Sequence, residues 1–264
     1  MDKLIVKLSG KNIYQHPFLI ARALSGLCQK VKLGVVHGGG PQISETMEKF
    51  GKKPTFVRGL RVTDEEDMEI TEMVLSGLIN KYLVGILLRE GVLACGISGK
   101  DGFLFQGEKH LPEEENIDLG RVGEIRQVNT RLIEVLWEGG FLPVVSPISA
   151  DKEGRSLNVN ADWAAAWLAL ATQAQGLFLF SDVPGVLADP TDPQSLIEEL
   201  AISQIPRLLE EDKIKEGMIP KLKMIEQVIR GGVGSVFIGH IREIEKLPQL
   251  SLDATLFGTT VVDG

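Results

Sequence analysis

The chain has 264 residues, 44% of them hydrophobic, and a net charge of -8 at pH 7. It can bury a large core, and we expect no nucleic-acid partner, because an acidic surface repels a polyanion and no run of lysine and arginine forms a basic patch. The longest apolar stretch, Trp163–Ala171, is short of the roughly 20 residues that span a bilayer, so we expect no membrane segment.

The N-terminus, Met1-Asp2-Lys3, leads directly into Leu4-Ile5-Val6 without the pattern of a secretory leader, which favours a cytoplasmic protein. From there, short β-branched runs alternate with segments of helical period. This alternation predicts an α/β protein with a mainly parallel open sheet covered by helices on both faces. The first four elements are predicted as strand, helix, strand and helix, at residues 4–8, 18–27, 31–36 and 41–50.

The middle of the chain begins with a long helix, which we predict from the capping-box pattern Thr63-x-x-Glu66 to about Leu88. A buried helix is predicted at 161–172, where the sequence is apolar nearly all round. Fresh strand, turn and helix signals follow Gln175-Gly176, so we expect two lobes, residues 1–175 and 176–264. Further strands are predicted at 93–97, 103–106, 141–145, 177–180 and 259–262, with a charged surface connection at 113–118.

Two glycine-containing turns follow the first two predicted strands: Lys7-Leu8-Ser9-Gly10 and His37-Gly38-Gly39-Gly40. Both would lie at the carboxyl edge of a parallel sheet, where ligands bind and backbone N–H groups can hold an anion. The glycines of one such turn could simply allow a tight connection. Two turns together with Lys7 favour a site for two anions. The familiar G-x-x-x-x-G-K-[ST] and G-x-G-x-x-G phosphate motifs are absent.

Polar side chains stand at alternate positions in Asn158-x-Asn160-x-Asp162, just before the buried helix. In an extended backbone they would share one face, and amides suit a ligand that carries an amide and a carboxylate. Asp162 alone could be a helix cap, but two asparagines on the same face require more than capping. Arg61, just before another helix, is of the type that binds a carboxylate through two parallel bonds, although a lone arginine can be an ordinary surface residue.

Two later segments carry further candidates. Met218 and Lys221 lie beside a proline, where a lone lysine could be solvated and idle. Ser181-Asp182 follows the strand at 177–180, again at a carboxyl edge, and precedes a Pro-Gly pair that could be a plain turn. No residues have metal-ligand spacing.

Taken in order, these motifs resemble the amino-acid kinase family over nearly the whole chain. The segments that carry the resemblance are 7–10, 37–42, 59–64, 96–102, 157–162, 181–186 and 217–221. The resemblance implies a three-layer αβα sandwich, an N-terminal lobe for an acylated amino acid, a C-terminal lobe for ATP, and a homodimer. It also implies transfer of the γ-phosphoryl group of ATP, with Mg²⁺ bound to the nucleotide, to the γ-carboxylate of N-acetyl-L-glutamate.

The same resemblance assigns roles to individual positions. Lys7 and Lys221 are implied to neutralise charge on the transferring group, with Asp162 orienting both. The residues implied to bind the acceptor are Gly38, Gly39, Arg61, Asn158 and Asn160, and those implied to bind the nucleotide are Lys7, Gly10, Ser181, Asp182, Met218 and Lys221. His37 is interpreted as structural, bonded to the turn backbone, because an ionised carboxylate needs no base.

One position departs from the family pattern. Ser9 stands where the family usually has the first of two glycines, so either the turn differs or Ser9 keeps an ordinary φ and contributes its hydroxyl. We also expect weak or no inhibition by arginine. The arginine-inhibited members of the family carry an extra N-terminal helix, whereas Met1-Asp2-Lys3 leads straight into a predicted strand here. The remaining alternatives are a kinase for carrier-linked aminoadipate or for free glutamate or aspartate, and a non-catalytic amino-acid sensor.

Overall fold

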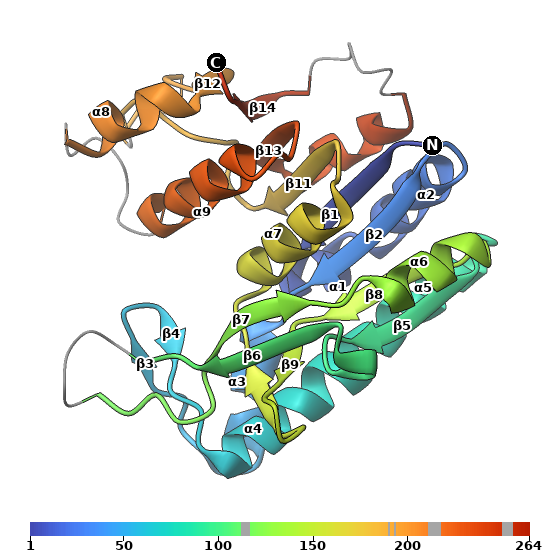
Figure 1. Ribbon diagram of the computed structural model, residues 1–264, viewed down its shortest axis with the longest axis vertical. Coiled ribbons are helices and arrows are strands. Elements are labelled where there is room, and N and C mark those ends of the chain that lie inside the picture. The colour runs from blue at the N-terminus through green and yellow to red at the C-terminus, as the bar shows by residue number, and fades with distance from the viewer. Residues whose placement is uncertain (112–116, 190, 193, 211–217, 250–255) are drawn as a thin grey trace.

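The computed structural model describes residues 1–111, 117–189, 191–192, 194–210, 218–249 and 256–264. It confirms the predicted class: an eight-stranded sheet, in the order β12-β14-β13-β11-β1-β2-β8-β5, has helices on both faces (Figure 1). Its neighbouring strands run parallel except for β13 and β14. The strands are β1 Lys3–Leu8, β2 Lys32–His37, β5 Ala94–Ser98, β8 Leu142–Ser146, β11 Gly176–Ser181, β12 Glu199–Ala201, β13 Ser235–His240 and β14 Gly258–Val262.

Two hydrophobic cores lie on the two faces of this sheet, because successive side chains of a strand point to opposite sides. On β1, Ile5 belongs to one core, whereas Val6 and Leu8 belong to the other, and all three are fully buried. The result is a three-layer sandwich. The α-helices are α1 Gly10–Gln15, α2 Pro17–Cys28, α3 Gly40–Lys49, α4 Glu65–Glu72, α5 Asn80–Arg89, α6 Arg131–Glu138, α7 Ala161–Thr172, α8 Ile205–Glu210 and α9 Ile219–Arg230.

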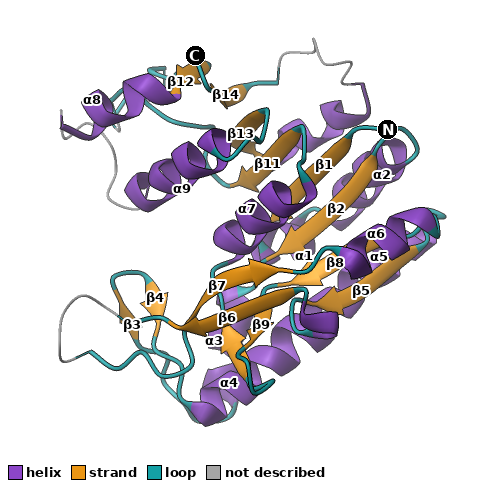
Figure 2. Cartoon of the chain, viewed as in Figure 1, coloured by secondary structure: helices purple, strands orange, loops and turns teal. Residues whose placement is uncertain are grey.

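A smaller sheet, in the order β10-β9-β6-β7, lies beside α7, and the hairpin β3-β4 stands next to it (Figure 2). Isolated bridges join Thr63 to Gly120 and Val122 to Asn158. These pairings bring Arg61 and Asn158, far apart in sequence, to the same region of the molecule. The strands are β3 Phe56–Val57, β4 Leu60–Arg61, β6 Phe105–Lys109, β7 Gly123–Val128, β9 Ile148–Ala150 and β10 Ser156–Asn158.

The long helix predicted after Thr63 is present, but it begins differently and is not uniform. Asp64 caps it, accepting a bond from the N–H of Asp67 (2.7 Å), so the capping box predicted at Thr63 is wrong by one residue. Between α4 and α5 the segment Met73–Ile79 is a π-helix, a form that often accompanies functional sites. A Cβ atom on Gly39 would overlap Leu75 and Ile79 of this segment, so the helix packs directly against the triple-glycine turn.

The same long helix meets a simple criterion for a membrane-spanning segment, although no such segment was expected from the sequence. Glu65–Arg89 is 25 residues long with a mean hydropathy of 1.4 in its most apolar window, enough to cross a bilayer by length and composition alone. Polar residues interrupt its apolar positions, so no long unbroken apolar run marks it in the sequence. Half of that window is buried inside the protein, as in the core helices of globular proteins, which pass the same test.

Several short elements were not predicted from the sequence: α1, α6, α8, the β3-β4 hairpin and the strands β7, β9, β10 and β12. The predicted start of β6 is two residues early, because Asp101–Phe103 is a 3₁₀ turn. Most of the charged connection predicted at 113–118 falls outside the described residues. The division into two lobes at Gln175-Gly176 stays a prediction, since β1 pairs with β2 on one side and with β11 on the other.

Candidate active site

Two lysines from opposite ends of the chain converge on one carboxylate. Nζ of Lys7, on β1, lies 2.8 Å from Oδ1 of Asp162, and Nζ of Lys221, on α9, lies 3.3 Å from Oδ2. Their side chains are only 12%, 16% and 19% exposed for Lys7, Lys221 and Asp162. The predicted convergence of these lysines on Asp162 is therefore present in the structure. The cluster carries one net positive charge in a largely buried site.

Asp162 is available for this cluster because another residue caps its helix. Asn160 is the N-cap of α7, and its Oδ1 accepts bonds from the N–H groups of Asp162 (2.8 Å) and Trp163 (3.4 Å). The alternative that Asp162 is only a helix cap is thus excluded, as expected from the sequence. Asp162 lies in the first turn of α7, where a helix favours negative charge.

The charge state of Asp162 follows from its neighbours. Burial alone would raise the pKa of its carboxyl, but the ammonium groups of Lys7 and Lys221 outweigh burial and hold that pKa well below its usual range. Asp162 is therefore ionised at neutral pH. Both of its oxygens face ammonium groups.

The two glycine turns lie back to back at the carboxyl ends of β1 and β2. A Cβ atom on Gly10 would stand 2.6 Å from Oε1 of Gln42 and 2.7 Å from Cα of Gly39, so close approach requires glycine there. The N–H of Gly38 donates to the carbonyl of Leu8 (2.9 Å) and so holds the turn itself. The turn N–H groups that remain for an anion come after Gly38.

Ser9 resolves the departure noted in the sequence. Its φ is -78°, and its hydroxyl accepts a bond from the N–H of Asn12 (3.2 Å), which makes Ser9 the N-cap of α1. The second of the two alternatives is confirmed: the residue keeps an ordinary backbone and uses its side chain. The first turn therefore forms without a glycine at this position.

Arg61 is buried, at 7% exposure, so it is not an ordinary surface residue. Its guanidinium donates to the carbonyl of Gly40 (2.9 Å) and to Oγ of Ser44 (2.8 Å) and lies 4.6 Å from the centre of the Phe56 ring. These contacts fix the hairpin against the first turn of α3. Asn158 lies nearby and donates from its amide to Oγ1 of Thr63 (3.1 Å).

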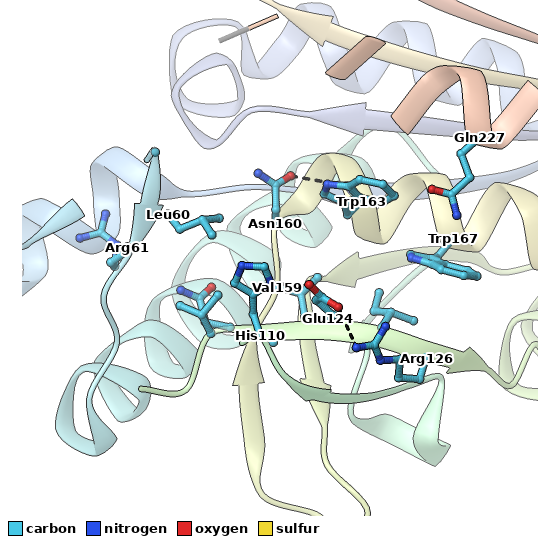
Figure 3. A pocket seen from close by; sticks show the side chains of 15 residues that line it. Leu60, Arg61, His110, Glu124, Arg126, Val159, Asn160, Trp163, Trp167 and Gln227 are labelled. Carbon is cyan, nitrogen blue, oxygen red and sulfur yellow. Dashed lines mark hydrogen bonds and ion pairs between the residues drawn. The ribbon is translucent and has the colours of Figure 1, made fainter. Parts of the chain in front are cut away.

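A cavity of about 430 Å³ joins three of the five predicted acceptor residues and does not include Gly38 or Gly39 (Figure 3). Arg61, Asn158 and Asn160 all line it, whereas Lys7 and Lys221 do not. Because Asp162 follows Asn160 by two residues, the cavity begins beside the ion cluster. Its walls are Gly59, Leu60, Arg61, His110, Val122, Gly123, Glu124, Ile125, Arg126, Asn158, Val159, Asn160, Trp163, Trp167 and Gln227.

Of the predicted nucleotide residues, Lys7 and Gly10 lie at the carboxyl end of β1, whereas Ser181, Asp182, Met218 and Lys221 lie in the C-terminal part of the chain. Ser181 ends β11, and its hydroxyl accepts a bond from the N–H of Val183 (3.4 Å). Asp182 pairs with Lys11, with Nζ and Oδ2 2.6 Å apart, at a site where both side chains are about half exposed. Met218 precedes α9 as its N-cap, while Gly217 lies outside the described residues. Lys11 was not among the predicted site residues, although its position directly after the predicted anion turn at Gly10 was a usable signal.

His37 is fully buried beneath the glycine turn, as the structural interpretation requires. Its Nδ1 lies 3.3 Å from the carbonyl of Gly38, and its Nε2 lies 3.2 Å from Nδ2 of Asn80. These partners suit a neutral ring that donates from Nδ1 and accepts at Nε2. Burial lowers the pKa of His37 from 6.5 to about 4.

We expect His37 to make the protein less stable as the pH falls. Between pH 6.5 and about 4 the unfolded chain binds a proton at this site and the folded protein does not. The free energy of unfolding then rises with pH in this window, by up to ~1.4 kcal/mol per pH unit for one proton. Urea unfolding of His37→Gln should give a shallower pH dependence than the wild type. Equal slopes for His37→Gln and the wild type would contradict this expectation.

Among the described residues, no group of three or more His, Cys, Asp or Glu side chains is placed to hold a metal ion. The model of the amino acid kinase family matches residues 2–240, which places the protein among enzymes that transfer phosphoryl groups. The chain belongs to this family.

Within this family, the chain is similar to acetylglutamate kinases. The acetylglutamate kinase of Methanocaldococcus jannaschii is 47% identical over 211 residues, which cover 77% of this chain and 70% of that protein. The acetylglutamate kinase of Methanothrix thermoacetophila is 46% identical over 242 residues, covering 89% and 83%.

Solved structures agree on the fold. The protein smu.665 from Streptococcus mutans matches with a TM-score of 0.80 and 28% identity, over 100% of this chain and 99% of that one. N-acetylglutamate synthase from Neisseria gonorrhoeae, complexed with coenzyme A and N-acetyl-glutamate, has a TM-score of 0.84 at 21% identity. That match covers 100% of this chain and 60% of the synthase.

Proposed function

We propose that this protein is an acetylglutamate kinase, which transfers the γ-phosphoryl group of ATP to the γ-carboxylate of N-acetyl-L-glutamate. The observation that carries the proposal is the buried cluster of Lys7 and Lys221 around Asp162, at 2.8 and 3.3 Å. Phosphoryl transfer needs positioned positive charge more than covalent chemistry, and two fixed ammonium groups supply it. The acceptor is proposed from the similarity to acetylglutamate kinases.

In the proposed reaction, an oxygen of the γ-carboxylate forms a bond to the γ-phosphorus as the bond to the β-phosphate oxygen breaks, and ADP leaves with that electron pair. The carboxylate is already ionised at neutral pH, so no base is required. Lys7 and Lys221 neutralise charge on the transferred group. Asp162 is a positioning residue that keeps the two ammonium groups in place.

The other site residues take their proposed roles from their positions. Arg61, Asn158 and Asn160 hold the acylated amino acid, and the turn at Gly38 and Gly39 faces the reacting carboxylate. On the nucleotide side, the proposed residues are Gly10, Ser181, Asp182 and Met218. Mg²⁺ would neutralise phosphate charge while bound to the nucleotide, because both oxygens of Asp162 already face lysines.

Part of the site supports the proposed division of labour between lobes. The acceptor residues precede position 176, and Ser181, Asp182 and Met218 follow it, whereas Lys7 and Gly10 would reach the nucleotide from the N-terminal lobe. The ion cluster takes Lys7 and Asp162 from the N-terminal lobe and Lys221 from the C-terminal lobe. We also propose a cytoplasmic location, since the reaction consumes ATP.

The direct test incubates the protein with ATP, Mg²⁺, hydroxylamine and one acceptor at a time. An acyl phosphate reacts with hydroxylamine to give a hydroxamate and inorganic phosphate, and the hydroxamate forms a coloured complex with ferric ion. We expect hydroxamate from N-acetyl-L-glutamate and far less from free glutamate, aspartate or a carrier-linked aminoadipate. No hydroxamate from N-acetyl-L-glutamate, with ATP consumed for another acceptor, would reassign the substrate; no turnover of any acceptor would favour a non-catalytic sensor.

We propose a homodimer on the basis of an exposed apolar face on the long helix. Met73, Leu78 and Leu88 are 54%, 54% and 52% exposed, and Tyr82 stacks on Tyr14 with ring centres 4.6 Å apart. A second copy of the chain would cover this face, and β5, an edge strand of the main sheet, runs next to the same helix.

The dimer proposal predicts that a charge on this face separates the subunits. Leu78→Asp should give the mass of a monomer by light scattering at a concentration where the wild type is a dimer, because a buried unpaired charge is costly. Phe257→Asp, at a similarly exposed position (55%) outside the helix, should stay dimeric. A monomeric wild type would refute the proposal.

A further inference from the structure

The acceptor cavity continues beyond the residues that the proposed acceptor needs. Its volume of about 430 Å³ lies in the range of pockets that enclose drug-sized ligands, which are larger than an acetylated glutamate. One end holds Arg61, Asn158 and Asn160. The other end is walled by Trp163, Trp167 and other residues to which the proposed reaction gives no role.

The two tryptophans form a continuous aromatic wall along α7. They are one helical turn apart, a rise of about 6 Å, and so lie on the same face. That face is turned away from the sheet: Ala164, Ala165 and Leu168 of α7 are fully buried, whereas both tryptophans are only partly buried. Figure 3 shows Trp163 next to Asn160 and Trp167 farther along the cavity.

The polar groups opposite this wall are already paired. One carboxylate oxygen of Glu124 contacts Nδ1 of His110. The other forms an ion pair with the guanidinium of Arg126, with Oε2 and Nη2 2.9 Å apart. Gln227, on α9, is the remaining polar group at the far end. With its charges neutralised, this part of the cavity suits an apolar ligand and not a second anion.

The position of the proposed acceptor indicates which ligand the tryptophan wall would bind. Asn160 is a proposed ligand of the acylated amino group, and its Oδ1 accepts the backbone N–H of Trp163 at the start of the wall. An acyl group placed at Asn160 therefore starts at the near end of the wall. An acyl chain about four carbons longer than acetyl, with C–C bonds of ~1.5 Å, would reach from Trp163 to Trp167.

We infer that the tryptophan wall binds the acyl chain of N-acyl-L-glutamates longer than N-acetyl-L-glutamate, so that the enzyme phosphorylates medium-chain N-acylglutamates. The inference rests on the proposed function and extends its substrate class. The chemical step is unchanged, because the γ-carboxylate still receives the phosphoryl group and ADP still leaves. Each methylene that leaves water for the wall adds up to about fourfold in binding.

The test compares kcat/KM for N-acetyl-, N-butyryl- and N-hexanoyl-L-glutamate in the hydroxamate assay. We expect the hexanoyl compound to reach at least about one-tenth of the value for the acetyl compound in the wild type. In Trp167→Ala the ratio of kcat/KM for the hexanoyl compound to kcat/KM for the acetyl compound should fall about tenfold. Trp167→Phe should keep most of the wild-type ratio. Phe50→Ala, which removes an exposed aromatic side chain (65%) outside the cavity, should keep the wild-type ratio.

A second readout requires no turnover. The chain has three tryptophans, and Trp137 is held apart from the cavity by its bond to the carbonyl of Leu33 (2.8 Å). N-hexanoyl-L-glutamate without ATP should change the tryptophan fluorescence of the wild type, and Trp167→Phe should reduce the change.

The outcomes separate the two proposals. Turnover of the acetyl compound with a hexanoyl ratio below one-tenth, or with a ratio that Trp167→Ala leaves unmoved, overturns the inference and leaves the proposed function standing. Failure to phosphorylate N-acetyl-L-glutamate overturns the proposed function itself.

Discussion

Lys221→Ala is expected to lower kcat by about 100- to 1,000-fold, the usual effect of removing one contact that stabilises charge in a transition state. Lys221 faces Asp162 at 3.3 Å in a site where its side chain is 16% exposed. Water cannot fully replace an ammonium group in such a site. Lys7→Ala should have an effect of the same size, because Lys7 occupies the equivalent position on the other oxygen.

Steady-state kinetics of the hydroxamate assay measure this effect, and circular dichroism checks that the fold is intact. Lys223→Ala is the matched control: it removes an exposed lysine from the same helix, two residues further on, and should leave kcat within about twofold. Lys221→Arg should not restore the wild-type rate, because a planar guanidinium cannot take the place of a compact ammonium. A kcat for Lys221→Ala close to that of Lys223→Ala would exclude Lys221 from the mechanism.

The parts of the fold that the sequence predicted are those with strong local signals. The strand at 4–8 and the helix at 161–172 have long apolar patterns that a parallel sheet and a buried helix require, and both are present. The short strands β3, β4, β9 and β10 have two or three residues each. They are stabilised by pairing with distant segments. Two or three residues are too few to show the alternation of apolar and polar side chains that predicts a strand.

The main residues of the candidate site were predictable because they belong to strong local motifs. The exact capping residues were not. Lys7, Asp162 and Lys221 belong to motifs whose order is specific, and the structure brings them together. Which of two neighbouring polar residues caps a helix depends on backbone angles, so the cap of α4 was predicted at Thr63 instead of Asp64, and the role of Asn160 as the cap of α7 was not predicted.

The pairing of Lys11 with Asp182 depends on the adjacency of β1 and β11. The cavity wall at Trp163 and Trp167 depends on which face of α7 the sheet covers. The sequence, apolar nearly all round, did not distinguish the faces of that helix. Both features follow from tertiary packing rather than from local pattern.

Asp162→Ala is expected to cost both stability and activity. The substitution leaves two ammonium groups facing one another with side chains that are 12% and 16% exposed. Removing one partner of a buried ionic cluster typically costs 3–5 kcal/mol, and the partial exposure of this cluster places the expected loss near ~3 kcal/mol. The urea midpoint should fall accordingly, and kcat should fall at least 100-fold because the lysines lose their positioning group.

A double variant separates the two effects. Adding Lys221→Met to Asp162→Ala removes one of the two uncompensated charges, so part of the lost stability should return while turnover does not. Glu226→Ala is the control for removing a carboxylate, because Glu226 pairs with the exposed Arg230 on the surface of α9 at 2.9 Å and such pairs contribute at most about 1 kcal/mol. If Asp162→Ala proved as stable as Glu226→Ala, the carboxylate would not be holding the two lysines together, and the proposed positioning of the transferred phosphoryl group would lose its structural basis.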